Sequence, residues 1–435
     1  MAYNEDVVKE QAKRYDSFYL YDESQIVART QDLKEHFPNI RFLYSIKCNS
    51  NVNVLRSVFS QGFGADAASA GEVRKALAAG VKKENIYYSA PGKSMEDIER
   101  AIKSSVLIAD SIDEIKRIQM AAERINFIAE IGLRINPSFS FYGGNGISSK
   151  FGIDEEQAIA FIKECDFSNI KITGIHVHLR GQELNADILA AYYESVLQVA
   201  KRIQDVNSTH LSFVNMGSGM GIPYAAEDVP LDIDKLSKSV NTALDTFRNS
   251  FPDTKIIIET GRYIVGKAGV YVTKVADRKV SYGKTYILLK NTLNGFVRPS
   301  LARLVAHYSL DPSPKGSEPL FTGTAAFQFN ALSQKKPFEQ VDLVGNLCTA
   351  TDVIAEDITM PYLECGDIVV ITNAGAYAAV LSPMQFSTQP QPAELFLTLM
   401  GKLKDDRISY FIEAAKPGGA STVRMNGALS AYLDR

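Results

Sequence analysis

A lysine at the end of an apolar run is the first residue whose position suggests chemistry. Lys47 closes the run Phe42–Ile46 and is followed by the polar turn Cys48–Asn51. Desolvation at the end of a buried strand can lower the pKa of an amine, and a neutral amine attacks aldehydes. A lysine that extends from a strand end into solvent is the plainer alternative, and Lys47 alone does not exclude it.

Polar or ionisable side chains follow most of the other apolar runs as well. They are Asp66, Asp110, Arg134, His178, the loop Asn215–Gly221, and Glu259 with Arg262. Each one alone fits a structural role, such as a helix cap, an ion-pair partner or a buried histidine. Their recurrence at the ends of nearly all the runs indicates one shared site.

Two of these segments have the composition of a phosphate site. Gly217, Ser218 and Gly219 form a glycine-rich loop, and Gly261 and Arg262 follow the next apolar run. Backbone N–H groups of such a loop, together with a cation, commonly bind phosphate in proteins.

The elements that must position these residues alternate in type up to about residue 265. Eight apolar runs are predicted as strands: 41–47, 62–66, 86–90, 106–109, 129–135, 171–178, 211–216 and 255–259. Between them, apolar residues at three- and four-residue spacing predict helices, for example over 70–79, 112–123, 155–164 and 186–203. The pattern predicts an α/β fold, a (β/α)8 TIM barrel over residues 25–268, with its active site at the carboxyl ends of the strands.

A second domain is predicted after residue 268, where strands follow one another without long helices. The expected strands are 270–275, 285–289, 340–344 and 367–372, and residues 1–24 join residues 269–435 in a mostly antiparallel β-domain. We expect residues 139–150 to form a mobile loop over the barrel mouth and residues 309–323 to form an exposed loop. No role is indicated for residues 402–435.

The composition excludes several classes of protein. A net charge of -3 over 435 residues offers no electrostatic footprint for nucleic acid or an anionic membrane. No apolar run has the length of a membrane span, and the acidic, polar start is not a signal peptide. The 4 cysteines lack CxxC spacing and the 5 histidines are scattered, so we expect no metal and a cytoplasmic enzyme with reduced thiols.

Six segments, in their order and spacing, resemble the fold-type III pyridoxal-phosphate (PLP) decarboxylases, which include the ornithine, arginine and diaminopimelate decarboxylases. These segments are Tyr44–Asn49, Asp66–Glu72, His176–His178, Glu259–Arg262, Gly345–Asp352 and Ala374–Tyr377. The resemblance implies an alanine-racemase-like barrel, PLP as the cofactor and an amino-acid substrate. The implied reaction joins the substrate amine to PLP, releases carbon dioxide and reprotonates the α-carbon.

The resemblance also implies roles for the residues at the strand ends. Lys47 would hold PLP through a Schiff base, and His178 would stack on its ring. Glu259 would face the pyridine nitrogen and keep it protonated. Asp66 would orient His178, and Arg134 would also lie at the cofactor. The phosphate would be held by Gly217, Ser218, Gly219, Gly261, Arg262 and Tyr377.

Two further residues resemble the family's second-domain motif. Cys348 would be the acid that reprotonates the α-carbon. Cys348 and Asp352 would reach the site from the neighbouring subunit, which implies a head-to-tail homodimer. A buried, inert thiol is the alternative for Cys348.

The sequence departs from the family pattern where a substrate would be recognised. Leu179, Arg180 and Gly181 replace a segment that usually carries a phosphate-binding serine, which Ser218 could compensate. Thr349 stands where diaminopimelate decarboxylases have a glutamate, and Ala302 where they have a tyrosine. We assign Arg298, Thr349 and Asp352 to the substrate, with Arg298 binding a carboxylate.

These departures favour the branch of the family that decarboxylates modified or conjugated amino acids for siderophores or antibiotics. A diaminopimelate decarboxylase, a PLP-dependent racemase and a catalytically inactive homologue remain as alternatives. Glu259 argues against the racemase, which tends to place an arginine at the pyridine nitrogen. A PLP-free Schiff-base aldolase would explain Lys47 but leaves the Cys348 motif unexplained.

Overall fold

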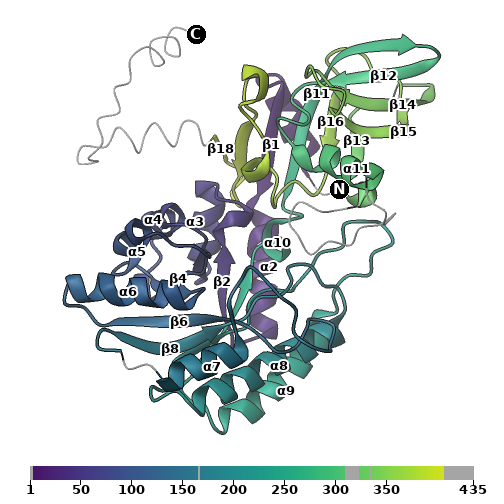
Figure 1. Cartoon of the computed structure of the whole chain (residues 1–435). Helices are drawn as coiled ribbons and strands as arrows, with labels where there is room; N and C mark the ends of the chain where they lie inside the picture. Colours follow the sequence, from purple (N-terminus) through teal and green to yellow (C-terminus); the bar gives the residue numbers. More distant parts are fainter. Residues whose placement is uncertain (1–2, 165–166, 309–322, 334, 406–435) are drawn as a thin grey trace.

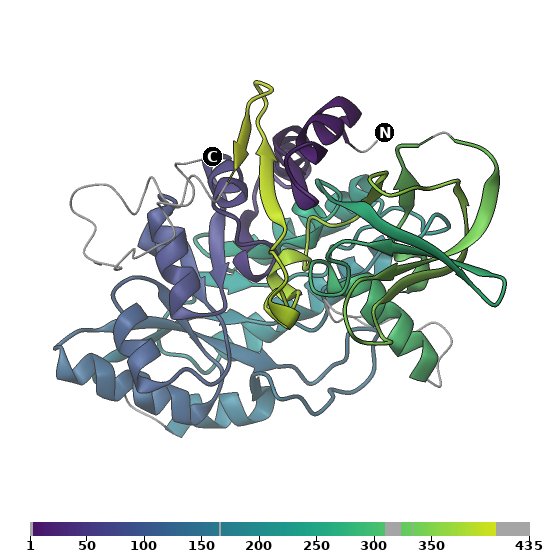
Figure 2. The same ribbon diagram turned by 90° about the horizontal axis from the view of Figure 1, so that it is seen from above.

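The computed structural model describes residues 3–164, 167–308, 323–333 and 335–405, and the chain forms two nine-stranded sheets. Figure 1 shows a barrel surrounded by helices and, beside it, a second sheet that contains β11, β12, β14 and β15. Figure 2 shows the same arrangement from above, with the second sheet on one side of the barrel.

The first sheet is a closed barrel of eight parallel strands. The strands are β2 (Arg41–Ser45), β3 (Gly64–Ala67), β4 (Ile86–Tyr88), β5 (Val106–Ala109), β6 (Ala129–Asn136), β8 (Ile170–His176), β9 (Phe213–Asn215) and β10 (Lys255–Thr260). They are hydrogen-bonded in the order β5-β4-β3-β2-β10-β9-β8-β6, and a β5–β6 pairing closes the ring. The predicted TIM barrel is thereby confirmed, and the short β7 (Ile153–Asp154) extends it beside β6.

Helices cover the outside of the barrel. They are α2 (Glu23–His36), α3 (Val52–Ser60), α4 (Ala70–Ala78), α5 (Met95–Ala101), α6 (Ile112–Arg124), α7 (Glu155–Glu164), α8 (Ala186–Gln204), α9 (Ile233–Arg248) and α10 (Arg262–Val265). Side chains that accept hydrogen bonds from backbone N–H groups start several of them, among them Ser69, Ser94 and Ser111. Because α4, α5 and α6 follow the carboxyl ends of β3, β4 and β5, these caps fix loops around the barrel mouth.

The inside of the barrel is filled by large apolar side chains. Leu43, Tyr87, Ile108, Phe213 and Ile257 form a separate buried cluster. The ring of Phe213 lies directly over the backbone of Gly132 and Gly174, where a β-carbon would collide with it. The barrel interior is therefore a packed core, and an open cavity lies at the end of the barrel that carries Lys47.

The second sheet is mostly antiparallel, as predicted. Its strands are β1 (Ser17–Asp22), β11 (Gly269–Ser281), β12 (Lys284–Leu289), β13 (Phe329–Ala331), β14 (Phe338–Gly345), β15 (Val353–Pro361), β16 (Ile368–Ile371), β17 (Ala393–Leu397) and β18 (Leu403–Asp405). Only the β1–β17 and β12–β14 pairings are parallel among the described strands. Two helices, α1 (Glu5–Ala12) and α11 (Val297–Tyr308), also belong to this part of the chain.

Two hydrogen bonds join the segment after β16 to the segment after β2, near Lys47. The Asn49 side chain donates to the carbonyl of Gly375 at 2.9 Å, and the Tyr377 N–H donates to the carbonyl of Cys48 at 2.8 Å. These contacts bring Tyr377 to the barrel mouth.

Some predictions lie beyond what the structure tests. The domain limits, 25–268 against 1–24 with 269–435, stay a prediction. The expected loop 309–323 and the tail 402–435 fall almost entirely outside the described residues. Within the described part of the chain, none of the helices is both long and apolar enough to cross a membrane.

Candidate active site

A cavity of about 450 Å³ opens at the carboxyl ends of the barrel strands. Most of the residues that the sequence assigned to catalysis or to a cofactor line it. These are Lys47, Arg134, His178, Ser218, Glu259, Gly261, Arg262 and Tyr377. The barrel therefore brings together residues from six segments that lie far apart in the chain.

Lys47 lies in a single helical turn, η1 (Ile46–Cys48), directly after β2. Its Nζ donates to Oδ2 of the fully buried Asp66 at 2.8 Å. Asp66 also accepts hydrogen bonds from Ser45 at 2.8 Å and from Ser89 at 2.6 Å. Asp66 therefore positions Lys47, whereas the expectation that it orients His178 is not supported by these contacts.

The charge of Lys47 differs from the sequence-based expectation. Burial favours the neutral amine, but the carboxylates of Asp66 and Glu259 outweigh this effect and raise the pKa of Lys47. The expected lowering of this pKa is therefore wrong for this structure, because two carboxylates lie within the field of the amine. Lys47 is an ammonium ion at neutral pH.

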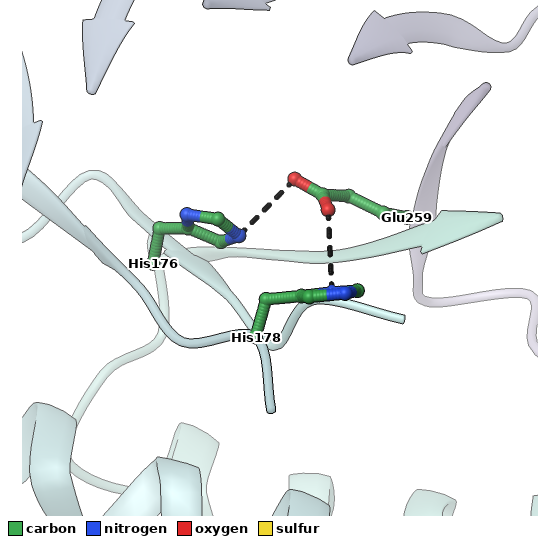
Figure 3. Close-up of side chains that lie close together, drawn as sticks. All are labelled: His176, His178 and Glu259. Atoms are coloured by element: carbon green, nitrogen blue, oxygen red, sulfur yellow. Dashed lines mark ion pairs between the residues drawn. The ribbon is translucent and has the colours of Figure 1, made fainter. Parts of the chain in front are cut away.

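Glu259 in β10 faces two histidines from β8 and the loop after it. Figure 3 shows the carboxylate between the rings of His176 and His178. Its Oε1 lies 3.3 Å from His176 Nε2, and its Oε2 lies 3.7 Å from His178 Nδ1. The Asn215 side chain donates a further hydrogen bond to Oε1 at 2.9 Å.

The protonation states of this group follow from its partners. Burial alone would raise the pKa of Glu259, but His176, Lys47 and His178 lower it, so Glu259 is a carboxylate. Burial lowers the pKa of His178 to about 3, and the attraction of Glu259 only partly opposes this effect. The His178 Nδ1 accepts a hydrogen bond from the Ser218 N–H at 3.0 Å, as a neutral imidazole can.

The glycine-rich loop after β9 turns sharply beside His178. Gly217 and Gly219 have φ of +67° and +143°, which glycine adopts without strain. A β-carbon on Gly217 would collide with the carbonyl of Val177, and one on Gly219 would collide with Leu189. Ser218 alone of these three residues lines the cavity; the two glycines shape the loop that carries it.

Arg262 provides a buried cation beside this loop. Its Nη1 donates to the Tyr224 hydroxyl at 2.8 Å, and its guanidinium lies 5.1 Å from the Tyr377 ring centre. The Arg262 Nε is buried and has no hydrogen-bond partner among the described residues. A buried donor without a partner is costly, so this atom is suited to an anion held in the cavity.

Arg134 in β6 also lines the cavity. Its guanidinium lies 3.5 Å from Asp110 and 4.3 Å from the ring centre of Phe151. Ser149, near the end of the predicted loop 139–150, lines the cavity, and so does Phe151, which directly follows this loop. The position of this loop at the barrel mouth is thus confirmed, while its mobility stays a prediction.

The three residues assigned to the substrate do not line the cavity. Arg298 is completely buried in α11, donates to the Ala376 carbonyl at 3.0 Å and packs against the rings of Tyr224 and Phe327. Thr349 is partly exposed, with its hydroxyl 2.9 Å from that of Thr351.

Asp352 is 3% exposed and holds its own segment together. Its carboxylate accepts hydrogen bonds from the Thr292 hydroxyl and from the N–H groups of Leu293 and Leu347. A carboxylate engaged in this way cannot reach another subunit's substrate without a rearrangement, so Asp352 is better described as a positioning residue for residues 345–352.

Cys348 is exposed on the same segment, with its Sγ 3.7 Å from the Ser387 hydroxyl. The alternative of a buried thiol is therefore excluded for this chain. Cys348 does not line the cavity of its own chain, and its action in a neighbouring subunit stays a prediction.

Sequence reasoning gave no role to several residues that complete the site. Ser45 and Ser89 fix Asp66, Asn215 fixes Glu259, and Tyr224 binds Arg262. Ser45, Ser89 and Asn215 stand at the ends of strands, and that position was the available signal. Tyr224 lies in an irregular segment and offers no such signal.

A lysine, a carboxylate and a glycine-rich anion site at the mouth of a TIM barrel define an enzyme with a phosphate-bearing cofactor. Residues 23–266 match the family described as pyridoxal-dependent decarboxylase, pyridoxal binding domain. This match covers more than half of the chain. The chain belongs to the pyridoxal-dependent decarboxylase family.

Similar proteins agree with this assignment. The chain is 32% identical over 397 residues to an L-glutamyl-[BtrI acyl-carrier protein] decarboxylase of Niallia circulans, covering 88% of this chain and 89% of that protein. It is 30% identical to a diaminopimelate decarboxylase of Helicobacter pylori, covering 87% and 90%. The crystal structure of diaminopimelate decarboxylase from Helicobacter pylori complexed with L-lysine superposes with a TM-score of 0.77 at 26% identity, covering 94% and 99%.

The chain is thus a PLP-dependent amino-acid decarboxylase, and the cavity has groups that suit this cofactor. Arg262 offers its unpartnered Nε to a phosphate, Glu259 offers a carboxylate to a ring nitrogen, and Lys47 offers an amine to an aldehyde. When bound, PLP supplies an electron sink that allows the α-carboxylate of an amino acid to leave as carbon dioxide.

Proposed function

We propose that this chain removes the α-carboxylate of a modified or conjugated amino acid in the biosynthesis of a siderophore or an antibiotic. The observation that carries the proposal is the chemistry at two positions. Thr349 presents a hydroxyl already paired with Thr351, and Ala302 is a buried methyl group in α11. Neither side chain offers a charged partner to the distal ammonium and carboxylate of diaminopimelate. A site without charged partners for these two groups favours diaminopimelate little over other amino acids.

The similarity to an enzyme named for a carrier-bound glutamyl substrate supports the same proposal. Diaminopimelate decarboxylation is the second candidate, because relatives of that name are nearly as similar to this chain.

In the proposed mechanism, different residues of the cavity bind the ring and the phosphate of the cofactor. Glu259 stays ionised between His176 and His178, and a carboxylate there favours a proton on the ring nitrogen that faces it. The neutral ring of His178 offers a flat surface for stacking. Ser218, Gly261, Arg262 and Tyr377 would hold the phosphate, and Arg134 completes the wall of the cavity. Gly217 and Gly219 shape the loop that carries Ser218.

Lys47 must lose a proton before its amine can react. Asp66, 2.8 Å away, is the nearest acceptor for that proton and is held by Ser45 and Ser89. Once the substrate amine has replaced Lys47 on the cofactor, the free amine of Lys47 would be available as a base beside the substrate.

Cys348 supplies the proton that replaces the carboxylate on the α-carbon, and it does so in the cavity of a second copy of the chain. Its exposure in this chain and its absence from the chain's own cavity support this assignment. We therefore propose a homodimer with shared sites, in which residues 345–352 of each copy face the cavity of the other. Arg298, although buried here, would bind a substrate carboxylate only after a shift of α11.

The test is carbon dioxide release from a panel of amino acids. It contains diaminopimelate, ornithine, lysine, arginine, a glutamyl thioester of phosphopantetheine and acylated 2,3-diaminopropionate. We expect turnover of a conjugated member at a kcat/KM at least about tenfold above that for diaminopimelate, the ratio that one lost polar contact commonly gives. Efficient turnover of meso-diaminopimelate alone would contradict the proposal.

A further inference from the structure

Arg180 stands at the barrel mouth, and the reactions described above give it no role. It lies in the segment after β8, two residues beyond His178, and lines the same cavity as Lys47. Only 17% of its side chain is exposed. An arginine of low exposure in a cavity wall is a candidate for contact with whatever fills the cavity.

Two loops hold the Arg180 side chain in place. Its Nε donates to the Gln182 carbonyl at 3.1 Å, and the Glu183 carboxylate lies 3.8 Å away. Its guanidinium lies 5.0 Å from the ring centre of Tyr142 and 6.0 Å from that of Phe141, both in the loop 139–150. The guanidinium is thus pre-positioned, which lowers the entropic cost of binding a ligand.

The charges around the cavity are unequal. Lys47, Arg134, Arg180 and Arg262 line it, whereas Glu259 is the one carboxylate among the lining residues. Asp66 directly balances Lys47, and Asp110 lies 3.5 Å from Arg134. Arg262, with its unpartnered Nε beside the glycine-rich loop, suits the cofactor phosphate.

Arg180 adds a cation on the side of the cavity formed by the loop 139–150. Glu183 lies 3.8 Å from Arg180, as Asp110 lies 3.5 Å from Arg134, but neither carboxylate lines the cavity, so the lining itself carries more positive than negative groups. A cation-rich lining with low-dielectric walls favours an anionic ligand. Arginine binds carboxylates and phosphates through two parallel hydrogen bonds.

We propose that Arg180 is a specificity-determining residue that binds an anionic group, a carboxylate or a phosphate, on the non-reacting arm of the substrate. This inference rests on the proposed function, since it assigns the arm of the conjugated amino acid a negative charge. Arg180 adds affinity for that arm and leaves the reacting carbon to the residues around Lys47.

The experiment uses the holoenzyme and matched substrate pairs. One pair is succinyl-2,3-diaminopropionate and its terminal amide; the other is the glutamyl thioester of phosphopantetheine and that of pantetheine. For the anionic member that wild type prefers, Arg180→Gln should raise KM at least about tenfold with kcat nearly unchanged. The neutral member should change less than about twofold, and Arg180→Lys should recover part of the affinity. The pair that responds identifies the anion as a carboxylate or a phosphate.

Two control variants and one binding measurement separate a substrate contact of Arg180 from other roles. Lys150→Ala removes an exposed cation at the end of the same loop and should leave both KM values unchanged. Tyr142→Leu tests whether Arg180 acts only by holding the loop; an equal loss for both members of a pair in Tyr142→Leu and in Arg180→Gln would overturn the proposal. A loss of PLP affinity in Arg180→Gln would instead assign Arg180 to the cofactor.

Direct binding separates this inference from the proposed function. If no conjugated amino acid is turned over, the proposed function fails, but Arg180 can still be tested by titrating holoenzyme with glutarate and with glutaramate. We expect glutarate to bind more tightly to wild type than to Arg180→Gln, with no such difference for glutaramate. Equal binding of glutarate to the two proteins would overturn the role of Arg180.

Discussion

At the residue scale, the cavity sets the protonation of its groups before any ligand enters. Lys47 is held as an ammonium by Asp66 and Glu259, although burial opposes its charge. The aldehyde of a cofactor reacts with a neutral amine, so binding of PLP must release a proton from Lys47. Asp66 stabilises the ammonium form of Lys47 through their hydrogen bond, and its carboxylate would also be the acceptor for that proton.

Lys47→Ala is expected to remove the covalent attachment of PLP. Wild-type protein with bound PLP should show a visible absorption band before treatment. After reduction with borohydride it should carry the cofactor on the peptide that contains Lys47, as measured by mass spectrometry. Lys47→Ala should lose both signals, and its rate should fall by several orders of magnitude because no other amine replaces Lys47. Lys171→Ala, which alters an exposed lysine on β8, serves as the control. A wild type that stays colourless with added PLP would contradict the assignment.

His178 should make the protein acid-sensitive. Its pKa is about 3 in the folded chain against an ordinary 6.5, so between these values the unfolded chain binds a proton that the folded chain does not. Stability is therefore greatest above about pH 6.5 and is lost as the pH falls toward 3. Between about pH 7.5 and pH 5 this group should cost about 2 kcal/mol.

Urea unfolding of PLP-free protein at the two pH values measures this loss. His178→Gln removes the titrating group and should reduce the loss by a comparable amount. His210→Gln is the matched control, because it removes an exposed histidine that lies outside the cavity. An identical pH dependence in wild type and His178→Gln would show that His178 does not titrate as described.

Residue types and their partners differ in how far the sequence reveals them. Lys47, His178 and Glu259 could be found because a TIM barrel gathers the ends of its strands at one mouth. Their hydrogen-bond partners could not be predicted from the sequence. Asp66, for example, contacts Lys47 and not His178, and its place near the end of a strand fits either partner. The burial of Arg298 and Asp352 depends on packing between distant segments, which one sequence does not report.

At the scale of elements, a buried ion pair fixes the loop between β4 and α5. Lys93 donates to the carbonyls of Ala90 and Ile108 at 2.6 and 2.7 Å and to Glu114 of α6 at 2.6 Å, and both charged side chains are fully buried. The same loop begins with Ser89, whose hydroxyl binds Asp66. The ion pair therefore connects a helix on the outside of the barrel to the residue that positions Lys47.

Glu114→Ala should destabilise the protein by about 3 to 5 kcal/mol, because it leaves a buried lysine without its counter-ion. Thermal or urea unfolding measures this loss, and PLP affinity should fall with it as Ser89 loses its support. Asp113→Ala removes an exposed carboxylate from the same helix and should change stability by less than about 0.5 kcal/mol. If Glu114→Ala were as stable as Asp113→Ala, the pair would have no structural role.

The barrel strands could be predicted because strands buried on both faces are short, continuous apolar runs. The four helices whose bounds were predicted, over 70–79, 112–123, 155–164 and 186–203, agree with the structure to within a residue or two. Ser69 and Ser111 cap two of them at positions visible in the sequence. The second sheet was harder. In this sheet, β1 lies between β11 and β17. Its parallel partner, β17, is more than 370 residues away from β1 in the chain. Its helix α11 was missed, because arginines and a proline interrupt its apolar pattern.

At the scale of the whole molecule, the cavity of one chain lacks the thiol that the proposed mechanism requires. It holds a lysine, a carboxylate and an anion site, but none of its lining residues is a cysteine. The exposed Cys348 lies on the second sheet, between β14 and β15. A second copy that presents this segment to the cavity would supply the missing proton donor and make assembly a condition of catalysis.

Mixed dimers test this arrangement. Lys47→Ala and Cys348→Ala homodimers should both be impaired, because each lacks one residue in both sites. Co-expressed with distinguishable tags, the two variants should give heterodimers with one intact site. Half of randomly paired dimers are heterodimers, so the mixture should regain about a quarter of the wild-type rate. The comparison is with the two variants purified separately and assayed under the same conditions. If the mixture is no faster than their average, Cys348 acts within its own chain or has no part in the reaction, and the shared-site homodimer must be abandoned.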